Sequence, residues 1–157
     1  MSETVIDRLT VVKARIARAV EAAGRSEHSV TLVAVSKTHP ATAVRTVAQA
    51  GQRVFGESYV QEALDKMDTL ADLPLEWHFI GPIQSNKTRD IAARFAWVHS
   101  VDRLKIAQRL SDQRPAELPP LQLCLQVNVS GEASKSGVSL EELPGLARAV
   151  MELPGLT

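Results

Sequence analysis

The first part of the chain carries apolar residues at steps of three and four, with polar residues between them. This spacing places the apolar side chains on one face of a helix. Gly24 follows the last of them and is well suited to end that helix. The face consists of Ile6, Leu9, Val12, Ile16 and Val20. The pattern therefore predicts an amphipathic helix before residue 24.

From residue 30 onward, short runs of apolar and β-branched residues alternate with stretches of helical periodicity. The short runs predict strands. They occupy residues 30–36, 53–57, 76–81, 97–101 and 121–129. A predicted helix follows each strand, and Pro40, Ser58, Asp102 and Pro144 stand near four of the helix starts. Ser58 with Gln61 has the spacing of a capping box.

Two further segments complete this prediction. The sequence "QSNK", residues 84–87, begins the helix after the third strand, with Ser85 and Asn86 as natural caps. At the other end of the chain, Leu156 and Thr157 follow the last helix and resemble the approach to a sixth strand.

The alternation of strands and helices predicts one α/β domain, residues 1–157, built on a parallel sheet with right-handed crossovers. Two architectures fit: an open, doubly wound sheet, or a (β/α)8 TIM barrel, which typically needs about 250 residues. The last strand favours the barrel because its odd-numbered residues are apolar while the even-numbered ones are Gln122, Cys124, Gln126 and Asn128. A strand covered on both faces would be apolar throughout. We therefore expect a leading helix and five βα units of an incomplete barrel.

Charge and composition exclude several classes of protein. Lys plus Arg and Asp plus Glu are 18 each, so the chain lacks the basic excess of a nucleic-acid-binding surface. The N-terminus has no apolar signal core, and no stretch approaches a membrane span, so we expect a cytoplasmic protein. Cys124 is the only cysteine, which rules out an internal disulfide, and His28, His39 and His99 lack metal-ligand spacing.

One residue stands out at the end of the first predicted strand. Lys37 follows "VTLVAVS" and precedes the turn into the next helix. In barrel folds, binding sites lie at the carboxyl ends of the strands. If burial there lowered the pKa of the Lys37 amine, the neutral form could condense with an aldehyde to a Schiff base. Pyridoxal 5'-phosphate (PLP) is the commonest biological aldehyde held in this way. Most lysines near strand ends are simply hydrated, however, and the position alone leaves that alternative open.

A set of motifs gives this lysine a context. The segments "LVAVSKTHP", "GQRVFGESYVQEALDK", "LEWHFIGPIQSNK", "SVDRLKIAQRL" and "VNVSGEASKSG" occur in this order. Their order and spacing closely resemble the YggS/PROSC family of PLP homeostasis proteins over nearly the whole chain. The resemblance implies a fold like the N-terminal domain of alanine racemase, with PLP bound to Lys37. It also implies a protein that holds and transfers PLP and so contributes to vitamin B6 homeostasis, without established enzymatic turnover.

The sequence departs from the family in two respects. The family motif G-E-N-Y reads Gly56-Glu57-Ser58-Tyr59 here. Members of the family also continue through three more βα units, which carry their phosphate and pyridine-nitrogen ligands. We therefore expect a fragment or truncated gene product with weakened PLP affinity. Its unclosed sheet edges would favour self-association.

Three other residues are candidates for cofactor contact, each with a simpler alternative. Ser58 occupies the family's Asn position and is equally suited to capping a helix. His78 alternates with Trp77 and Phe79 and so faces the barrel interior, where it could also be a hydrogen-bonded core residue. Lys135, in the Gly- and Ser-rich loop 130–137, is either a hydrated loop lysine or a second amine that accepts the aldehyde during transfer.

Two other functions remain open from the sequence. The first is a PLP-dependent racemase or decarboxylase, which would need a positioned acid or base; Tyr59 is the only tyrosine and a poor candidate. The second is an α/β module for another phosphate ligand, in which Lys37 supplies only charge. For the favoured reading the partners are PLP and, during transfer, apo forms of PLP-dependent enzymes. Neither nucleic acid nor membrane is expected as a partner.

Overall fold

The structure, a computed structural model, describes residues 4–157 and begins with the predicted amphipathic helix. Helix α1 spans Val5–Ala22. Its N-cap Thr4 accepts a hydrogen bond from the Asp7 amide (3.2 Å), while the Asp7 carboxylate accepts one from the Thr4 amide (2.8 Å). This reciprocal pair is a capping box. Gly24 follows the helix with a φ of 61°, a left-handed conformation that glycine adopts without strain.

The five predicted strands form one parallel sheet in chain order. They are β1 (Ala34–Val35), β2 (Val54–Glu57), β3 (Glu76–Phe79), β4 (Trp97–Val101) and β5 (Gln122–Leu125). The fourth strand has the predicted limits, while the first and fifth are much shorter than predicted. Strand β1 pairs only with β2 within the described sheet, so its residues before Ala34 have no ladder to join.

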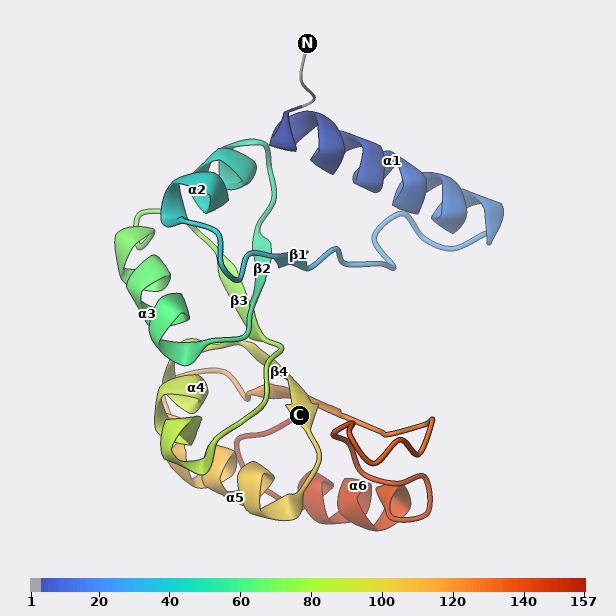
Figure 1. Ribbon diagram of the computed structural model, residues 1–157, viewed down its shortest axis with the longest axis vertical. Coiled ribbons are helices and arrows are strands. Elements are labelled where there is room, and N and C mark those ends of the chain that lie inside the picture. The colour runs from blue at the N-terminus through green and yellow to red at the C-terminus, as the bar shows by residue number, and fades with distance from the viewer. Residues whose placement is uncertain (1–3) are drawn as a thin grey trace.

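Helices follow the strands along one side of the sheet. They are α2 (Ala41–Gln49), α3 (Val60–Thr69), α4 (Thr88–Arg94), α5 (Leu104–Gln113) and α6 (Leu143–Met151), with a 3₁₀ turn η1 (Ser85–Lys87) before α4. Figure 1 shows an arc, with α1 at one end, α6 at the other and α2 to α5 along its outer side. A doubly wound sheet reverses its strand order and carries helices on both faces. The order seen here is that of an unclosed barrel, as the sequence predicted.

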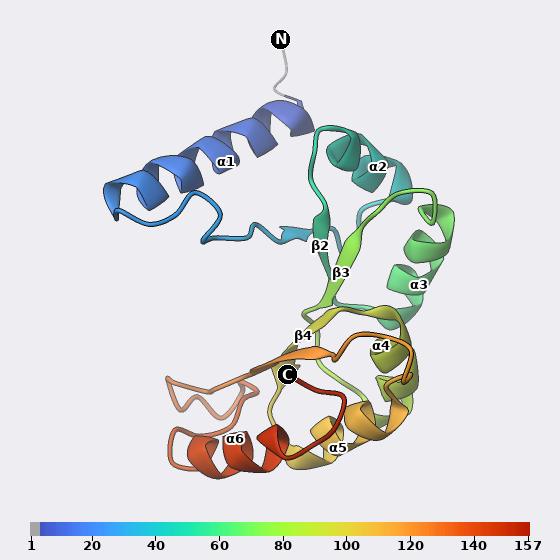
Figure 2. The same cartoon turned by 180° about the vertical axis from the view of Figure 1, so that it is seen from behind.

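The hydrophobic core lies between the sheet and the outer helices. Phe55 and Phe79 project from the sheet into this layer, and Phe79 meets Phe95 edge to face with 5.3 Å between ring centroids. His78 lies on the other face of the sheet, which we call the concave face, opposite Trp77 and Phe79. Trp97 also lies there, stacked on His78 at 5.5 Å. The view from behind in Figure 2 shows the same arc and its open inner side.

Three predicted helix caps are wrong. Tyr59, not Ser58, is the N-cap of α3, and neither it nor the N-caps of α4 and α5 makes a side-chain capping bond. Ser85 instead lies in η1, where its carbonyl accepts a hydrogen bond from the Thr88 hydroxyl. Asp102 precedes the N-cap of α5, and its carboxylate accepts a hydrogen bond from the Gly137 amide (3.2 Å). A tertiary partner thus replaces the capping bond at Asp102, and a tighter 3₁₀ turn replaces it before α4.

The end of the chain occupies the outer edge of β5. The Leu123 amide donates to Thr157 O (2.8 Å), and the Thr157 amide donates to Leu121 O (3.0 Å). This pairing matches the predicted approach to a further strand and covers residues 121–123 of the edge that was expected to be open. Among the described residues β1 remains the unpaired edge, and Val35 on it is 52% exposed.

Candidate functional site

The structure places Lys37 in the turn that leaves the carboxyl end of β1. The next residue, Thr38, has a φ of 65°, a strained conformation for a β-branched side chain. Lys37 is exposed, and within residues 4–157 its amine makes no hydrogen bond or ion pair. The location is as predicted, but the expectation of an amine sheltered from water is wrong for this chain. The reason is the fold, because no other strand of residues 4–157 pairs with the outer side of β1.

A buried ion pair lies beneath this turn. Lys66 of α3 donates a hydrogen bond to Glu57 Oε1 at the end of β2 (2.7 Å), and their side chains are 6% and 0% exposed. The same ammonium donates to the Ser36 carbonyl (2.7 Å). The Ser36 hydroxyl in turn donates to Glu57 Oε1 (2.6 Å). The residue before Lys37 is thereby tied to two elements.

Glu62 of α3 holds the residue after Lys37. Its Oε1 accepts a hydrogen bond from the Thr38 amide (2.6 Å) and one from Lys66 Nζ (2.6 Å). The hydrogen bond from Lys66, assisted by the Thr38 amide, lowers the pKa of the Glu62 carboxyl although partial burial opposes this. Lys66 therefore links both flanks of the Lys37 turn. The only sequence signal for this network is the i,i+4 spacing of Glu62 and Lys66.

His78 is part of a hydrogen-bonded chain on the concave face. Its Nδ1 lies 2.8 Å from His99 Nε2, and its Nε2 lies 2.8 Å from Glu76 Oε1. Both ring nitrogens thus have protein partners, and the residue is 4% exposed. This geometry favours the alternative of a hydrogen-bonded core histidine, and the cofactor role of His78 stays a prediction. From the sequence, His99 was noted only for its lack of metal-ligand spacing, and its contact with His78 was not predicted.

The histidine pair predicts a pH-dependent stability. Burial, together with the charge of His78, lowers the pKa of His99 from its ordinary value of 6.5. Between 6.5 and the lowered value the unfolded chain therefore binds more protons than the folded one. The free energy of unfolding should be highest above pH 6.5 and fall as the pH drops below it. In His99→Gln this dependence should weaken. His28→Gln, in an exposed loop, should retain it in the same denaturant titrations, and equal pH profiles for all three proteins would contradict the assignment.

Ser58 is half-buried beside Gly81, at the carboxyl ends of β2 and β3. A Cβ on Gly81 would come within 2.7 Å of Ser58 Cα, so the two backbones touch. Among the described residues the Ser58 hydroxyl has no hydrogen-bond partner, and it is therefore free to bind a ligand.

Lys135 belongs to the loop after β5. The Asn128 side chain organises this loop: its amide donates to the Glu132 carbonyl (2.9 Å), and its oxygen accepts from the Gly131 amide (3.1 Å). Lys135 itself is exposed. The contact of Asp102 with Gly137 ties the loop to the end of β4. Lys135 therefore lies at the carboxyl end of the sheet, as Lys37 does.

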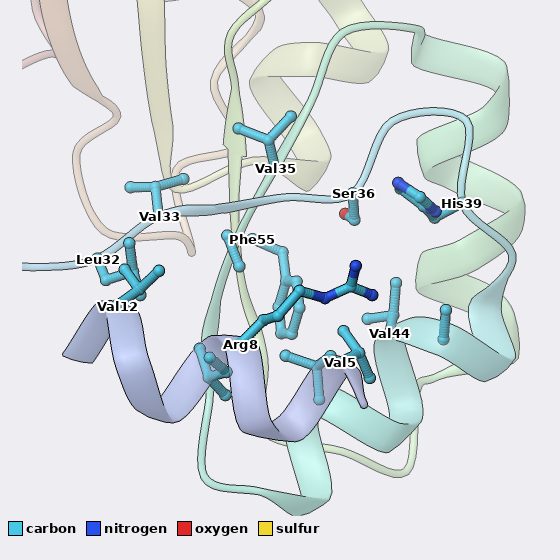
Figure 3. A pocket seen from close by; sticks show the side chains of 14 residues that line it. Val5, Arg8, Val12, Leu32, Val33, Val35, Ser36, His39, Val44 and Phe55 are labelled. Atoms are coloured by element: carbon cyan, nitrogen blue, oxygen red, sulfur yellow. The ribbon is translucent and has the colours of Figure 1, made fainter. Parts of the chain in front are cut away.

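An apolar cavity of about 350 Å³ lies between α1, β1 and α2. Figure 3 shows its lining, in which Val5 and Val12 of α1 face Leu32 and Phe55. Lys37 does not line it, and the lining is largely aliphatic. Ser36 and His39, on either side of the Lys37–Thr38 turn, also line the cavity, so it borders the candidate site although most of its lining is apolar helix–sheet packing. No cluster of three metal-ligating side chains occurs in residues 4–157. In the same range, no helix is long and apolar enough to cross a bilayer.

Fold and site define a class of protein: an unclosed (β/α) barrel with an exposed lysine that has no side-chain partner among residues 4–157, in the turn after its first strand. Residues 8–157 match the family described as alanine racemase, N-terminal domain, and the chain belongs to that family. It is 67% identical over 153 residues to the pyridoxal phosphate homeostasis protein of Pseudomonas aeruginosa, covering 98% of this chain and 66% of the relative. The chain thus spans about two thirds of that relative's length.

Solved structures agree with this assignment. PipY of Synechococcus elongatus PCC7942, solved without PLP, superposes with a TM-score of 0.85 at 37% identity, covering 98% of this chain and 67% of PipY. The structure of PipY with PLP bound gives a TM-score of 0.76 at 39% identity, over 89% of this chain and 65% of PipY. The resemblance to PLP homeostasis proteins and the alanine racemase-type fold, both predicted from sequence, are confirmed.

Proposed function

We propose that this chain binds PLP through the amine of Lys37 and serves intracellular PLP homeostasis. The observation that carries the proposal is a lysine whose amine has no partner among the described residues and whose turn, at the carboxyl end of β1, is held by hydrogen bonds on both sides. The high identity to a PLP homeostasis protein and the likeness to PLP-bound PipY support it.

The residues present fit the aldehyde end of PLP. Lys37 Nζ is the group that would hold the aldehyde carbon, through a C=N bond whose formation would release the carbonyl oxygen and the two amine hydrogens together as one water molecule. PLP supplies the electrophilic carbonyl for this condensation. Lys66 cannot take that role, because three hydrogen bonds occupy its buried ammonium. Ser58 is the nearby hydroxyl that we infer contacts the cofactor.

A binding function is favoured over a racemase or decarboxylase. Catalysis at the carbon next to an amino group needs a positioned acid or base. Tyr59 is 57% exposed at the start of α3, and His78 and His99 are hydrogen-bonded to each other. The relatives at 67% and 56% identity are also named homeostasis proteins.

The remaining parts of the proposal concern transfer and location. Lys135 is the second amine that we infer receives PLP before it passes to apo enzymes. Its exposure in a loop at the carboxyl end of the sheet is compatible with that role. The recipient enzymes, the cytoplasmic location and self-association through the β1 edge stay predictions.

Substitution of Lys37 gives the first test. Purified chain titrated with PLP should develop the visible absorbance of a lysine Schiff base, and Lys37→Ala should lose it. Lys135→Ala is the matched control. It should keep the absorbance band but slow the transfer of PLP to an apo enzyme. A band that persists in Lys37→Ala would contradict the proposal. Saturable binding of PLP without any band would instead favour the phosphate-ligand module.

A further inference from the structure

We propose that Lys66, together with Glu57 and Glu62, is a positioning device for Lys37. The inference rests on the proposed function of Lys37 and extends it to residues that do not touch the cofactor. A lysine amine ends a flexible four-carbon stem, so its reach into a site depends on how firmly its backbone is held. The Lys37 side chain makes no hydrogen bond or ion pair within residues 4–157. The direction in which it leaves the backbone is therefore set by the residues on either side.

The first half of the device fixes Ser36. Its amide donates to Gly56 O (3.0 Å), which continues the β1–β2 ladder by one residue. Its hydroxyl and carbonyl are bound to Glu57 and Lys66, respectively. All three polar groups of this buried serine therefore have partners. The residue before Lys37 has no freedom to rotate without breaking a buried bond.

The second half fixes Thr38. A left-handed φ at a threonine is unfavourable on its own, and surrounding bonds must hold it in place. The bond from the Thr38 amide to the Glu62 carboxylate does so, and the His39 amide adds a bond to Ser36 O (3.1 Å). The strain thus lies directly next to the lysine that is proposed to react. Strained backbone of this kind clusters at functional sites.

The sheet alone could not supply this order. Strand β1 has two residues and one neighbour, so few backbone bonds hold it. A buried ion pair is a weak source of stability compared with apolar packing, but a fully bonded one can specify a single geometry. Lys66 has three acceptors, one for each of its protons. The network therefore holds the end of β1 in place, as the additional ladder hydrogen bonds of a second neighbouring strand would do elsewhere in a sheet.

The test compares two alanine variants of α3. Glu62→Ala removes the acceptor of the Thr38 amide, whereas Asp65→Ala removes an exposed carboxylate of the same helix whose one hydrogen bond within residues 4–157 is to Gln61. Amide exchange measured by mass spectrometry should rise about tenfold at Thr38 in Glu62→Ala and stay unchanged in Asp65→Ala. Glu62→Gln keeps an oxygen at the same place and should recover most of the protection.

The second readout is reaction with PLP itself. After borohydride trapping, labelling of Lys37 relative to Lys135 should fall about tenfold in Glu62→Ala and remain normal in Asp65→Ala. A merely structural role would lower the thermal midpoint and shift the labelling of both lysines together. Unchanged exchange at Thr38, or an unchanged labelling ratio, would overturn the positioning role. Absence of Lys37 label in the unaltered chain would overturn the proposed function, and this inference with it, before any variant is made.

Discussion

Lys66→Met should lower the free energy of unfolding by roughly 3–5 kcal/mol, the usual penalty for removing one partner of a buried ion pair. The loss is large because Glu57 would remain as a fully buried carboxylate without its cation, and Glu57 Oε2 already lacks a partner in the described chain. The Ser36 carbonyl would lose a donor as well. Urea unfolding followed by circular dichroism measures the change directly.

Two further variants separate this effect from a general cost of losing a lysine. Lys105→Met makes the same chemical change on the exposed face of α5 and should shift stability by less than about 0.5 kcal/mol. The double variant Glu57→Gln with Lys66→Met removes both charges and should recover much of the stability, because no uncompensated ion stays buried. If Lys66→Met unfolds at the same urea concentration as Lys105→Met, the buried network is not formed in solution.

Gly81→Ala should be the second most damaging change, with a loss of about 3 kcal/mol, at the upper end of overpacking effects. A Cβ at this position would meet the backbone of Ser58, within 2.7 Å of its Cα and closer still to its carbonyl oxygen. Backbone cannot move aside as a flexible side chain can, so the carboxyl ends of β2 and β3 would have to separate. Thermal unfolding reports the loss.

Gly145→Ala is the matched control for that variant. Gly145 lies in α6, and a Cβ there would meet nothing within 4 Å. Alanine in a helix is favoured over glycine by roughly 0.5–1 kcal/mol, so this variant should unfold slightly later than the unaltered chain. Equal thermal midpoints for Gly81→Ala and Gly145→Ala would show that the close approach of Gly81 to Ser58 is absent.

The fold was largely predictable because its signals are local. The five strands and the helices after them follow from periodicity, and the one-sided polarity of residues 121–129 correctly favoured a barrel over a doubly wound sheet. Strand lengths were overestimated at β1, where pairing depends on a neighbour that apolar patterning does not report. The cap at Asp102 failed because a tertiary partner, the Gly137 amide, binds its carboxylate, and the cap at Ser58 failed because α3 begins one residue later, with Tyr59 as its N-cap.

The candidate site was predictable in place but not in environment. The position of Lys37 after an apolar run placed it correctly at the carboxyl end of β1. The exposure of Lys37 depends on which strands flank β1, and the residues of β1 alone do not reveal its neighbours. Lys66 is harder still to foresee, because a lysine is normally assigned to the helix surface. Its burial follows from three acceptors that come from two other segments and its own helix.

Borohydride reduction of the PLP-treated chain, followed by peptide mass spectrometry, tests most directly whether the amine at residue 37 is the one that holds the cofactor. We predict a pyridoxyl group on the peptide containing Lys37, at higher occupancy than on any other lysine. An unmodified Lys37 in a chain that carries the label elsewhere, or no label on Lys37 at any PLP concentration, would contradict it.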